Sequence, residues 1–503
     1  MKETLTLAAA ATAISIATST GSAPSSFQTH PIVPEKELII TDLDVVESPL
    51  AAYPGPFSFG HLIEQLAEPG KTSEFVRNWL SSWESEQMVN KQTVPARDAI
   101  REKVIEPWMK RDGFEGSTRA EWEVNLANAP FRLLAIVNRI DSGPFVQIGR
   151  REIKFGAGSS AIPAYYGSDG LLPNTGEARF IYAANDSHGE PLEGGFTIIF
   201  EYRLPIAAPL ASDAVKAGSK KKQLLLGLGG AFDDDDDTPN LTEAERTLPS
   251  RLQAARYAAD WHTLGTFKSF DAGYLCALSS LTAPITDRTD GRAPNLAQLR
   301  TNEGALAPVQ EAREYGYASN KLQMRPVAAT PAIVYNSDDR RFGRALGRYV
   351  DRNQRGIMSN THTVPLAVRD PAGGDMLPFR AGSSLMPKTP GREAAGFRWD
   401  ATQVRYREAL RRFSLNTCSG CHCGETNTTF YHVHPRRAGE ESKLSKFLQL
   451  GADLEVDSLS SRGGKVEINE MGQRIAIFEA VLNPAYDQKE IYHLVRDRTR
   501  RAH

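Results

Sequence analysis

Short apolar runs and longer amphipathic repeats follow one another in mixed order along the chain. The runs have lengths typical of buried strands, and stretches rich in Asn, Asp, Gly and Pro separate them. The candidate strands are 131–137, 178–183, 196–202, 322–327 and 332–335. Apolar residues at helical spacing predict helices at about 59–85, 95–110, 242–262 and 271–281. This order predicts an α+β fold with a largely antiparallel sheet.

Changes in composition predict how the chain is divided. The first residues have the composition of a targeting segment, and a Pro- and Gly-rich stretch with few apolar repeats precedes the C-terminal part. The expected regions are a signal peptide at 1–23, an extended N-terminal segment at 24–56, the α+β body at 57–364, a linker at 365–398 and a small, mainly helical segment at 399–503.

The N-terminus predicts export. Lys2 precedes an apolar stretch at 5–17, and small residues follow that stretch, which is the order of a secretory signal. No cysteine stands before Cys276, so this signal has no cysteine that could carry a lipid anchor. The expected location is the periplasm or the outside of the cell, which are oxidising spaces.

Charge and composition narrow the classes of function. The 503 residues include 59 Lys and Arg against 61 Asp and Glu, which gives a formal net charge of −2. This balance argues against a broad basic face for nucleic acid. No interior apolar run is long enough to cross a bilayer, so no transmembrane helix is expected. Four cysteines are too few for a disulfide framework, so a hydrophobic core must hold the fold.

Several charged residues stand close to the predicted strands. Buried charges are costly unless they are paired, so these residues predict either a ligand cleft or salt bridges at strand ends. Salt bridges at strand ends are the preferred interpretation. The residues are Arg139, Asp141, Glu177, Arg179, Glu201, Arg300 and Glu303.

The strongest chemical signal lies in residues 416–423. Cys418, Cys421 and His422 form Cys-x-x-Cys-His, the attachment motif of c-type haem. Two thiols at this spacing reach the two vinyl groups of one haem, and the imidazole that follows lies under the iron. The motif therefore predicts one covalent haem c with His422 as its proximal ligand.

Helical repeats flank this motif. Tyr406, Leu410 and Phe413 share one helix face just before it, and an apolar stripe covers 468–482 after it. Small c-type cytochromes pack a helix before the motif against a terminal helix. The pattern therefore predicts a c-type-cytochrome-like segment at the C-terminal end.

The second axial ligand of the iron has several candidates. His432 and His434 would lie on the same side of an extended segment, and His432 is the first choice. Met471 has a suitable distance along the chain, but it lies on an apolar helix stripe, where Met is usually core filler. An open sixth position is the remaining alternative, and it would permit oxidase or peroxidase chemistry.

The same residues also suit a structural zinc site. Cys418, Cys421 and Cys423, together with one histidine, would make a Cys₃His site. Cys423 has no use in haem attachment, and Cys276 is the only other cysteine in the chain. A disulfide between Cys276 and Cys423 is therefore the alternative to a zinc ligand at Cys423.

Longer runs around these residues are distinctive as well. Residues 416–422 are NTCSGCH, and 425–436 are ETNTTFYHVHPR. The body contains PFRLLAIVNRID at 130–141, GEARF at 176–180, FEY at 200–202 and LRTNE at 299–303.

From about 120 to 437 the chain resembles a family of large, uncharacterised secreted bacterial proteins with a C-terminal, c-type haem-like NTCxGCH segment. The resemblance implies a haem-type cysteine motif, and it favours His432 over His434 because His432 stands at the matching position. Cys423 departs from the family pattern, which favours the disulfide with Cys276 over a ligand role. The resemblance implies no known activity.

The expected function is one-electron transfer by an exported protein with one c-type haem and a redox partner in the periplasm or outside the cell. The alternative is a non-enzymatic secreted binding or scaffold protein with a structural zinc site. No catalytic residue is assigned, and enzymatic activity is left open.

Overall fold

A computed structural model describes most of the chain between residues 30 and 483. The described residues are 30–140, 174–205, 249–289, 291–335, 340–358, 362, 364–370, 373–386, 399–426, 431–449, 454–457 and 465–483. Residues Ile32–His503 form one compact unit, and Met1–Pro31 form another. The predicted signal peptide, Asp141 and the acidic run at 233–237 lie outside the described residues.

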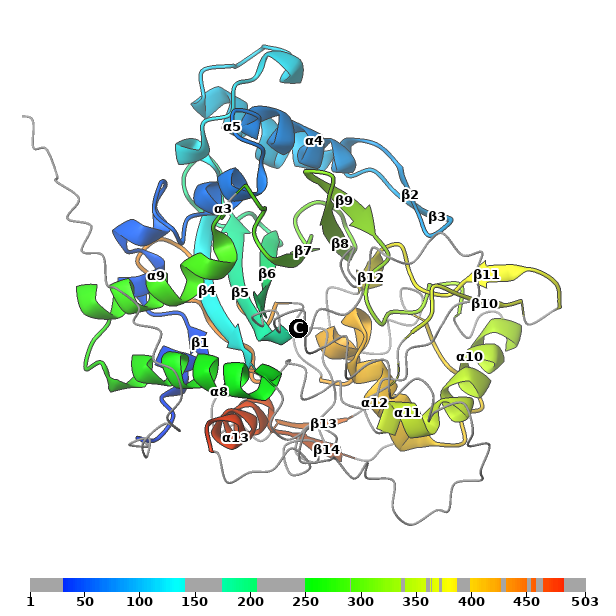
Figure 1. Cartoon of the computed structure of the whole chain (residues 1–503). Coiled ribbons are helices and arrows are strands. Elements are labelled where there is room, and N and C mark those ends of the chain that lie inside the picture. The colour runs from blue at the N-terminus through cyan, green and yellow to red at the C-terminus, as the bar shows by residue number, and fades with distance from the viewer. Residues whose placement is uncertain are drawn as a thin grey trace, which may run out of the picture. The chain divides into compact units, whose positions relative to one another are not determined.

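An antiparallel sheet of eight strands forms the centre of the larger unit (Figure 1). Its order is β1-β4-β5-β6-β7-β8-β12, and β9 also pairs with β8. The strands are β1 (Ile39–Ile40), β4 (Phe131–Arg139), β5 (Asn174–Ala184), β6 (Thr197–Pro205), β7 (Leu296–Asn302), β8 (Gln310–Ala318), β9 (Lys321–Arg325) and β12 (Ser384–Met386). The remaining strands form three small hairpins: β2 (Gln87–Val89) with β3 (Gln92–Val94), β10 (Ala367–Arg369) with β11 (Met376–Pro378), and β13 (Leu454–Asp457) with β14 (Lys465–Ile468).

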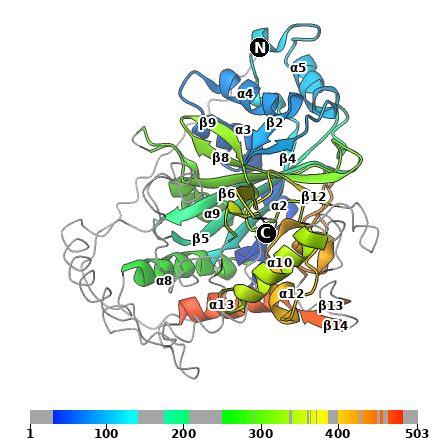
Figure 2. The ribbon, with the colours of Figure 1, turned by 90° about the vertical axis from the view of Figure 1, so that its right-hand side faces the viewer.

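Helices pack around this sheet. They are α1 (Pro34–Glu37), α2 (Leu43–Val46), α3 (Phe59–Leu66), α4 (Thr72–Glu84), α5 (Glu106–Arg111), α8 (Pro249–His262), α9 (Ala272–Thr286), α10 (Arg340–Arg352), α11 (Gln354–Met358), α12 (Arg407–Leu415) and α13 (Glu470–Leu482). The two ribbon views agree that α3, α4 and α5 lie on one side of the sheet and α13 on the other (Figures 1 and 2). The α+β class with an antiparallel sheet is therefore confirmed.

The two faces of the sheet differ in chemistry because strand side chains alternate between them. One face is aromatic: the Phe59 ring of α3 contacts Tyr182 and Phe200, and Trp79 of α4 contacts Tyr315 edge-on. The other face carries charges among its apolar residues. The aromatic face also holds a buried ion-pair cluster, in which Arg313 pairs with Glu303 and Glu311, but the charges of the other face act on the cysteine motif.

Two regional predictions are corrected by the structure. The described part of 24–56 is not extended, because it folds into α1, β1 and α2 and buries Val45 and Ile40. The described parts of 365–398 are not a plain linker either, since they contain β10, β11 and β12. Strand β12 pairs with β8 and so extends the main sheet.

Most predicted elements are found, but the strand at 332–335 was wrong and several strands were missed, β7 and β8 of the main sheet among them. The runs at 131–137, 178–183, 196–202 and 322–327 correspond to β4, β5, β6 and β9, whereas 332–335 forms a turn. Strands β7 and β8 were not predicted. Their buried positions hold charged residues such as Arg300 and Glu314, so no apolar run marks them.

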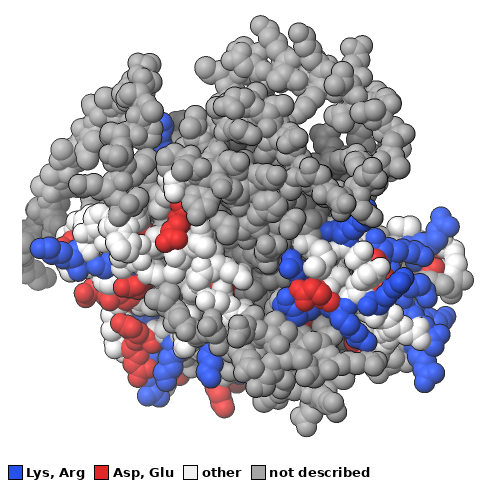
Figure 3. Space-filling model, turned by 90° about the horizontal axis from the view of Figure 1, so that it is seen from below, with Lys and Arg blue, Asp and Glu red and all other residues white. Residues whose placement is uncertain are grey.

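No helix in the described residues is long and apolar enough to cross a bilayer. The basic residues, however, are not evenly spread. Figure 3 shows Lys and Arg side chains gathered at one end of the lower face. Helix α10 contributes exposed arginines to the surface, namely Arg340, Arg341, Arg344, Arg348 and Arg352.

Candidate cofactor site

Helix α12 leads directly into the cysteine motif. It ends at Leu415, and Thr417 continues the chain by donating its hydroxyl hydrogen bond to the Ser414 carbonyl oxygen at 2.7 Å. The motif then forms a π-helical turn, Gly420–Gly424. Gly420 is required here, because a Cβ on it would lie 1.9 Å from the Ser414 carbonyl oxygen. The glycine between the two cysteines therefore lets the turn pack against the end of α12.

Both motif cysteines are buried. Cys418 is 1% exposed and Cys421 is 0% exposed, and the Cys418 backbone N–H donates to Thr330 Oγ1 at 3.1 Å. Burial raises the pKa of the Cys418 thiol to about 11, although the positive charge of Arg300 partly opposes this effect. A thiol with a raised pKa is a poor nucleophile at neutral pH, which argues against a thioredoxin-like exchange role.

The structure brings His432 to the motif. Its Nε2 lies 3.6 Å from Cys421 Sγ, and its ring centre lies 4.5 Å from that of His422, with the planes tilted by 30°. Nδ1 of His432 is hydrogen-bonded with Ser445 Oγ at 2.9 Å. A hydrogen bond at Nδ1 fixes the ring of a metal-binding histidine and directs Nε2 to the metal. Ser445 was not predicted, since no sequence pattern connects it with His432.

The other predicted ligands lie elsewhere. His434 is half-buried, and burial lowers the pKa of its imidazole. Met471 packs in the main hydrophobic core, 3% exposed. Neither residue lines the space beside His422 and His432.

Cys276 is exposed on α9 as a free cysteine, so the expected disulfide with Cys423 is not formed in this structure. The side chain of Cys423 lies outside the described residues. Helix α9 packs against β6, while the motif follows α12, so the two cysteines belong to different elements. The sequence suggested this disulfide because Cys276 is the only cysteine outside the 418–423 segment.

A slot separates the charged face of the sheet from the segment that carries His422 and His432. It has a volume of about 50 Å³ and is partly open to solvent, so it is much smaller than a typical small-molecule site. The sheet contributes Val137, Arg139, Arg179, Ile181, Thr197, Ile199 and Asn302 to its walls. The facing side is formed by His422, His432, Val433, Phe447, Leu448 and Arg474.

Of the predicted charged residues, Glu177, Arg179, Glu201 and Arg300 form a row across the sheet, whereas Glu303 pairs with Arg313. Cross-strand register places Arg179 opposite Glu201 and Arg300 opposite Glu314. The ion pairs are Arg179–Glu177 at 2.6 Å, Arg179–Glu201 at 3.5 Å, Arg300–Glu201 at 3.2 Å, Arg300–Glu314 at 3.3 Å and Arg325–Glu314 at 3.1 Å. Alternating signs along the row compensate the cost of burying each charge. Cys418 lies near enough to the row for the charges of Arg300, Glu314 and Glu201 to act on the pKa of its thiol.

Tyr431 anchors the segment that contains His432. Its hydroxyl donates to the Gly194 carbonyl oxygen at 3.0 Å and accepts from the Gly304 backbone N–H at 3.1 Å. A Cβ on Gly195 would lie 2.7 Å from the Tyr431 ring, and one on Gly304 would lie 2.7 Å from its hydroxyl. Gly195 and Gly304 therefore leave the space that receives this side chain, and its hydrogen bonds fix the residue next to His432.

The donor set fits both haem and a compact metal ion, but the spacing differs between the two. Metal–nitrogen bonds of about 2 Å place imidazoles on opposite sides of one ion with ring centres roughly 6 Å apart. The observed 4.5 Å is shorter, so trans coordination by His422 and His432 needs the rings to separate. In a tetrahedral zinc site the sulfur and nitrogen ligands lie about 3.5 Å apart, which agrees with the 3.6 Å between Cys421 and His432.

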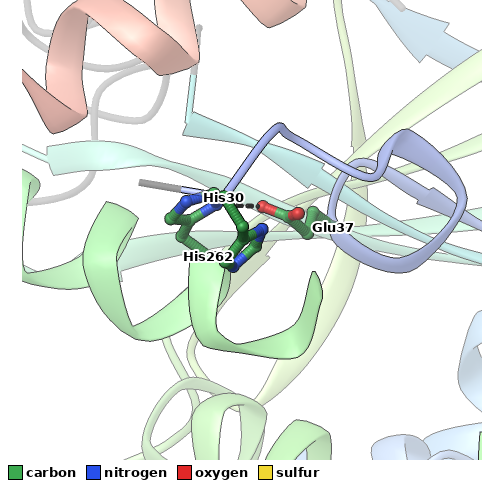
Figure 4. Close-up of side chains that lie close together, drawn as sticks. All are labelled: His30, Glu37 and His262. Carbon is green, nitrogen blue, oxygen red and sulfur yellow. Dashed lines mark hydrogen bonds and ion pairs between the residues drawn. The ribbon is translucent and has the colours of Figure 1, made fainter. Parts of the chain in front are cut away.

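A second histidine has a carboxylate partner that the sequence did not indicate. His262 Nδ1 lies 2.8 Å from Glu37 Oε2, and Glu37 is fully buried (Figure 4). The other carboxylate oxygen of Glu37 accepts from the Val33 backbone N–H at 2.7 Å. This pair joins α1 to the end of α8. Figure 4 also labels His30, which belongs to the unit Met1–Pro31.

Comparisons with protein-family models, curated proteins and solved structures find no match for this chain. The resemblance to the secreted family therefore stays a prediction. The chemistry of the slot and its surroundings is the basis for assigning a function.

Proposed function

We propose that this protein is an exported one-electron carrier with one c-type haem attached at the cysteine motif, beside His422 and His432. Cys418 and Cys421 would hold the haem through thioether bonds, His422 would be the proximal ligand and His432 the distal ligand. The observation that carries the proposal is that the histidine 11 positions after Cys421 in sequence is buried against that cysteine.

The surroundings of the motif support this proposal. A thioether is neutral, so it suits the buried positions of Cys418 and Cys421, where a free thiolate is disfavoured. Ser445 orients His432, and Tyr431 fixes the adjacent backbone. Val137, Ile181 and Ile199 supply an apolar surface on the sheet side of the slot. An apolar surrounding and fixed axial ligands are the means by which a protein sets the potential of a haem.

Haem c, when bound, supplies reversible one-electron chemistry, and the chain's own residues control it. His432 would close the second axial position, which disfavours reactions with small molecules at the iron. The paired charges of the row would keep the electrostatic field at the site fixed during electron transfer. The partner remains an unidentified redox protein of the periplasm or the exterior.

A structural zinc site is the second candidate, and one distance favours it. The 3.6 Å between Cys421 Sγ and His432 Nε2 agrees with the distance between two ligand atoms of a tetrahedral zinc ion. Coordination of an iron from opposite sides needs the rings of His422 and His432 to lie farther apart than they do. In this case the protein would be a binding or scaffold protein, and the metal would join the 418–432 segment into one rigid unit.

Absorption spectra and a denatured mass separate the two candidates. The protein is produced with the haem-attachment machinery, and spectra are recorded in the oxidised and dithionite-reduced states. A sharp reduced α-band and one haem mass retained after denaturation are expected. A colourless protein of polypeptide mass with about one equivalent of zinc would overturn the electron-transfer proposal.

His432→Ala tests the proposed axial ligand. In the haem protein this change opens the sixth position, so we expect the oxidised spectrum to change from low spin to high spin and added imidazole to restore it. His434→Ala is the matched control, because His434 does not line the slot. An unchanged spectrum in His432→Ala, or a change only in His434→Ala, would exclude His432 as the ligand.

A further inference from the structure

Helices α10, α11 and α12 form a surface that is rich in arginine. Together they contain nine arginines, no lysine and two acidic residues, Asp351 and Glu408. Figure 3 shows basic side chains gathered at one end of the lower face, on the side where α10 lies in Figure 1. A chain whose total charge is −2 therefore has one strongly basic surface.

Both acidic residues of this surface already have partners. The carboxylate of Asp351 accepts a hydrogen bond from the backbone N–H of Arg405 at 3.0 Å, just before α12 begins. The carboxylate of Glu408 is paired with Arg411 at 2.5 Å and with Arg412 at 3.0 Å. Within the described residues, neither carboxylate forms an ion pair with an arginine of α10.

Four arginines form one ridge along α10. They stand at every fourth position, and each is exposed: Arg340, Arg344, Arg348 and Arg352. Residues four apart are neighbours on a helix surface, and the rise of about 1.5 Å per residue places them roughly 6 Å apart along the axis. The arginine ridge therefore presents a regular series of guanidinium groups along roughly 18 Å of helix.

The inner face of α10 fixes the direction of the arginine ridge. Leu346 and Val350 are buried in a core that includes residues of α12. A Cβ on Gly347 would lie 2.1 Å from the Thr402 carbonyl oxygen, so the helix backbone lies directly against the segment before α12. Rotation of the helix would break these contacts, and the arginines therefore stay on the outer side.

The outer side of α10 limits the kind of partner that it can bind. Every exposed position of this helix is an arginine, and every apolar side chain is buried or half-buried. A helix that enters a lipid surface needs apolar side chains on its outer face, which α10 lacks. Guanidinium groups pair with carboxylates through two parallel hydrogen bonds. A helix with a carboxylate at every fourth position has the same repeat and the opposite charge, so it complements the arginine ridge.

We propose that the arginine ridge of α10 is a docking surface for an acidic helix of a partner protein. The inference goes beyond the proposed function and does not depend on the cofactor, because α10 contains no residue of the cysteine motif. Helix α10 packs on α12, which ends just before the motif, so a docked partner would lie beside the helix that leads to the candidate site. Exposed charges make most of the contacts, so the complex should be weak and sensitive to salt.

Fluorescence anisotropy with labelled synthetic peptides tests the proposal on the full-length protein. The striped peptide is a helix with glutamate at every fourth position, and the scattered peptide has the same composition with its glutamates spread around the helix. At about 20 mM salt we expect the striped peptide to bind more tightly than the scattered one. The affinity should fall as the salt concentration rises, because salt screens exposed charges.

Substitutions in the arginine ridge locate the binding surface. The triple variant R340Q, R344Q and R348Q removes three of the four ridge charges and should weaken binding of the striped peptide at least about tenfold. The triple variant R340K, R344K and R348K keeps the charges but not the planar forks, so a smaller loss is expected. Circular dichroism of each variant checks that the helices are retained. If they are not, the comparison of the two peptides on the wild type decides.

The matched control removes three positive charges elsewhere. The triple variant K110Q, K321Q and R437Q changes exposed residues outside the three helices and should alter the affinity less than about twofold. Equal weakening by the two glutamine variants, or equal binding of the two peptides by the wild type, would overturn the inference. So would tighter binding to phosphatidylglycerol vesicles than to the striped peptide at equal negative charge, because the occupant would then be a membrane surface.

The outcomes also separate this inference from the proposed function. A colourless protein that binds the striped peptide through the arginine ridge would overturn the haem proposal and leave this inference intact. A haem protein whose ridge variants bind the peptide as the wild type does would overturn this inference alone.

Discussion

At the residue scale, the site depends on single side chains that fix their neighbours. The sequence predicted no role for Tyr431, yet its hydroxyl joins Gly194 and Gly304 across the fold. The residue after it, His432, meets Cys421 and Ser445. A tyrosine held by two backbone groups thus sets where the imidazole can lie.

Tyr431→Phe should lower the free energy of unfolding by about 2 kcal/mol. The change removes two hydrogen bonds and leaves the buried Gly304 N–H without its acceptor. Urea unfolding measures the loss, and Tyr406→Phe, at an exposed tyrosine, is the control that should change little. The cofactor spectrum of Tyr431→Phe should shift as well, since His432 loses its fixed neighbour. Equal stability of the two variants would contradict the anchoring role.

A buried carboxyl gives the fold a pH dependence of known sign. Glu303 lies 3.2 Å from Arg313 Nε, but burial dominates and raises the pKa of Glu303 from its ordinary value of 4.5 to about 7. Between these two values the folded state holds more protons than the unfolded state. The free energy of unfolding should therefore decrease as the pH rises from about 4.5 to about 7.

Glu303→Gln should remove this part of the pH dependence, because the amide does not titrate. Urea midpoints at several pH values between 4.5 and 8 measure it. Glu115→Gln is the control, since Glu115 forms an exposed pair with Lys110. The raised pKa of Glu303 would be contradicted if the stability of the wild type did not decrease over this window. It would also be contradicted if Glu303→Gln kept the same decrease as Glu115→Gln.

At the element scale, the strands β5 to β9 are unusual because their buried cross-strand partners are charged. Arg300 on β7 joins Glu201 on β6 to Glu314 on β8, and all three side chains are buried. Such a row specifies the register of the strands, because a slip by one residue would turn each charge to the aromatic face. This explains how a sheet can pair correctly where its strands lack apolar runs.

Arg300→Met should destabilise the protein by about 3–5 kcal/mol, because it leaves two buried carboxylates without their shared partner. Thermal or urea unfolding measures the change. Arg437→Ala is the matched control: its pair with Glu190 is exposed, so it should cost less than about 1 kcal/mol. A cost for Arg300→Met no larger than that of the control would show that the row does not support the sheet.

At the scale of the whole molecule, a net charge near zero is compatible with a strongly basic local surface. The total is −2, but the exposed side of α10 carries five arginines within 13 residues (Figure 3). Its buried side, with Leu346 and Val350, packs on α12, which leads into the cysteine motif. Helix α12 therefore connects the basic surface of α10 with the candidate site.

The protein should bind a heparin column at low salt despite its negative total charge, because local fields and not net charge determine such binding. The triple variant R340E, R344E and R348E should elute earlier. The triple variant K110E, K321E and R437E makes the same change in charge at scattered exposed positions and should elute close to the wild type. Equal retention of the two triple variants would contradict a localised basic surface.

The same scale explains what the sequence could and could not predict. Strands β4, β5 and β6 were predicted because apolar runs mark strands whose neighbours are apolar. Strands β7 and β8 were missed, and the charge of Arg300 suggested a strand end and not a strand centre. Only the cross-strand register makes these residues partners, and register is a property of several strands together.

The sequence alone determined the chemistry that is available: an α+β body, a Cys-x-x-Cys-His motif, and His432 as a nearby imidazole. Spacing along the chain suffices for such a motif because its residues are covalent neighbours. The tertiary structure decided what surrounds it: Ser445 on His432, Tyr431 against Gly195 and Gly304, and arginines from β4, β5 and α13 at one slot. These contacts join residues up to several hundred positions apart, and no local pattern encodes them, because each depends on how distant elements pack.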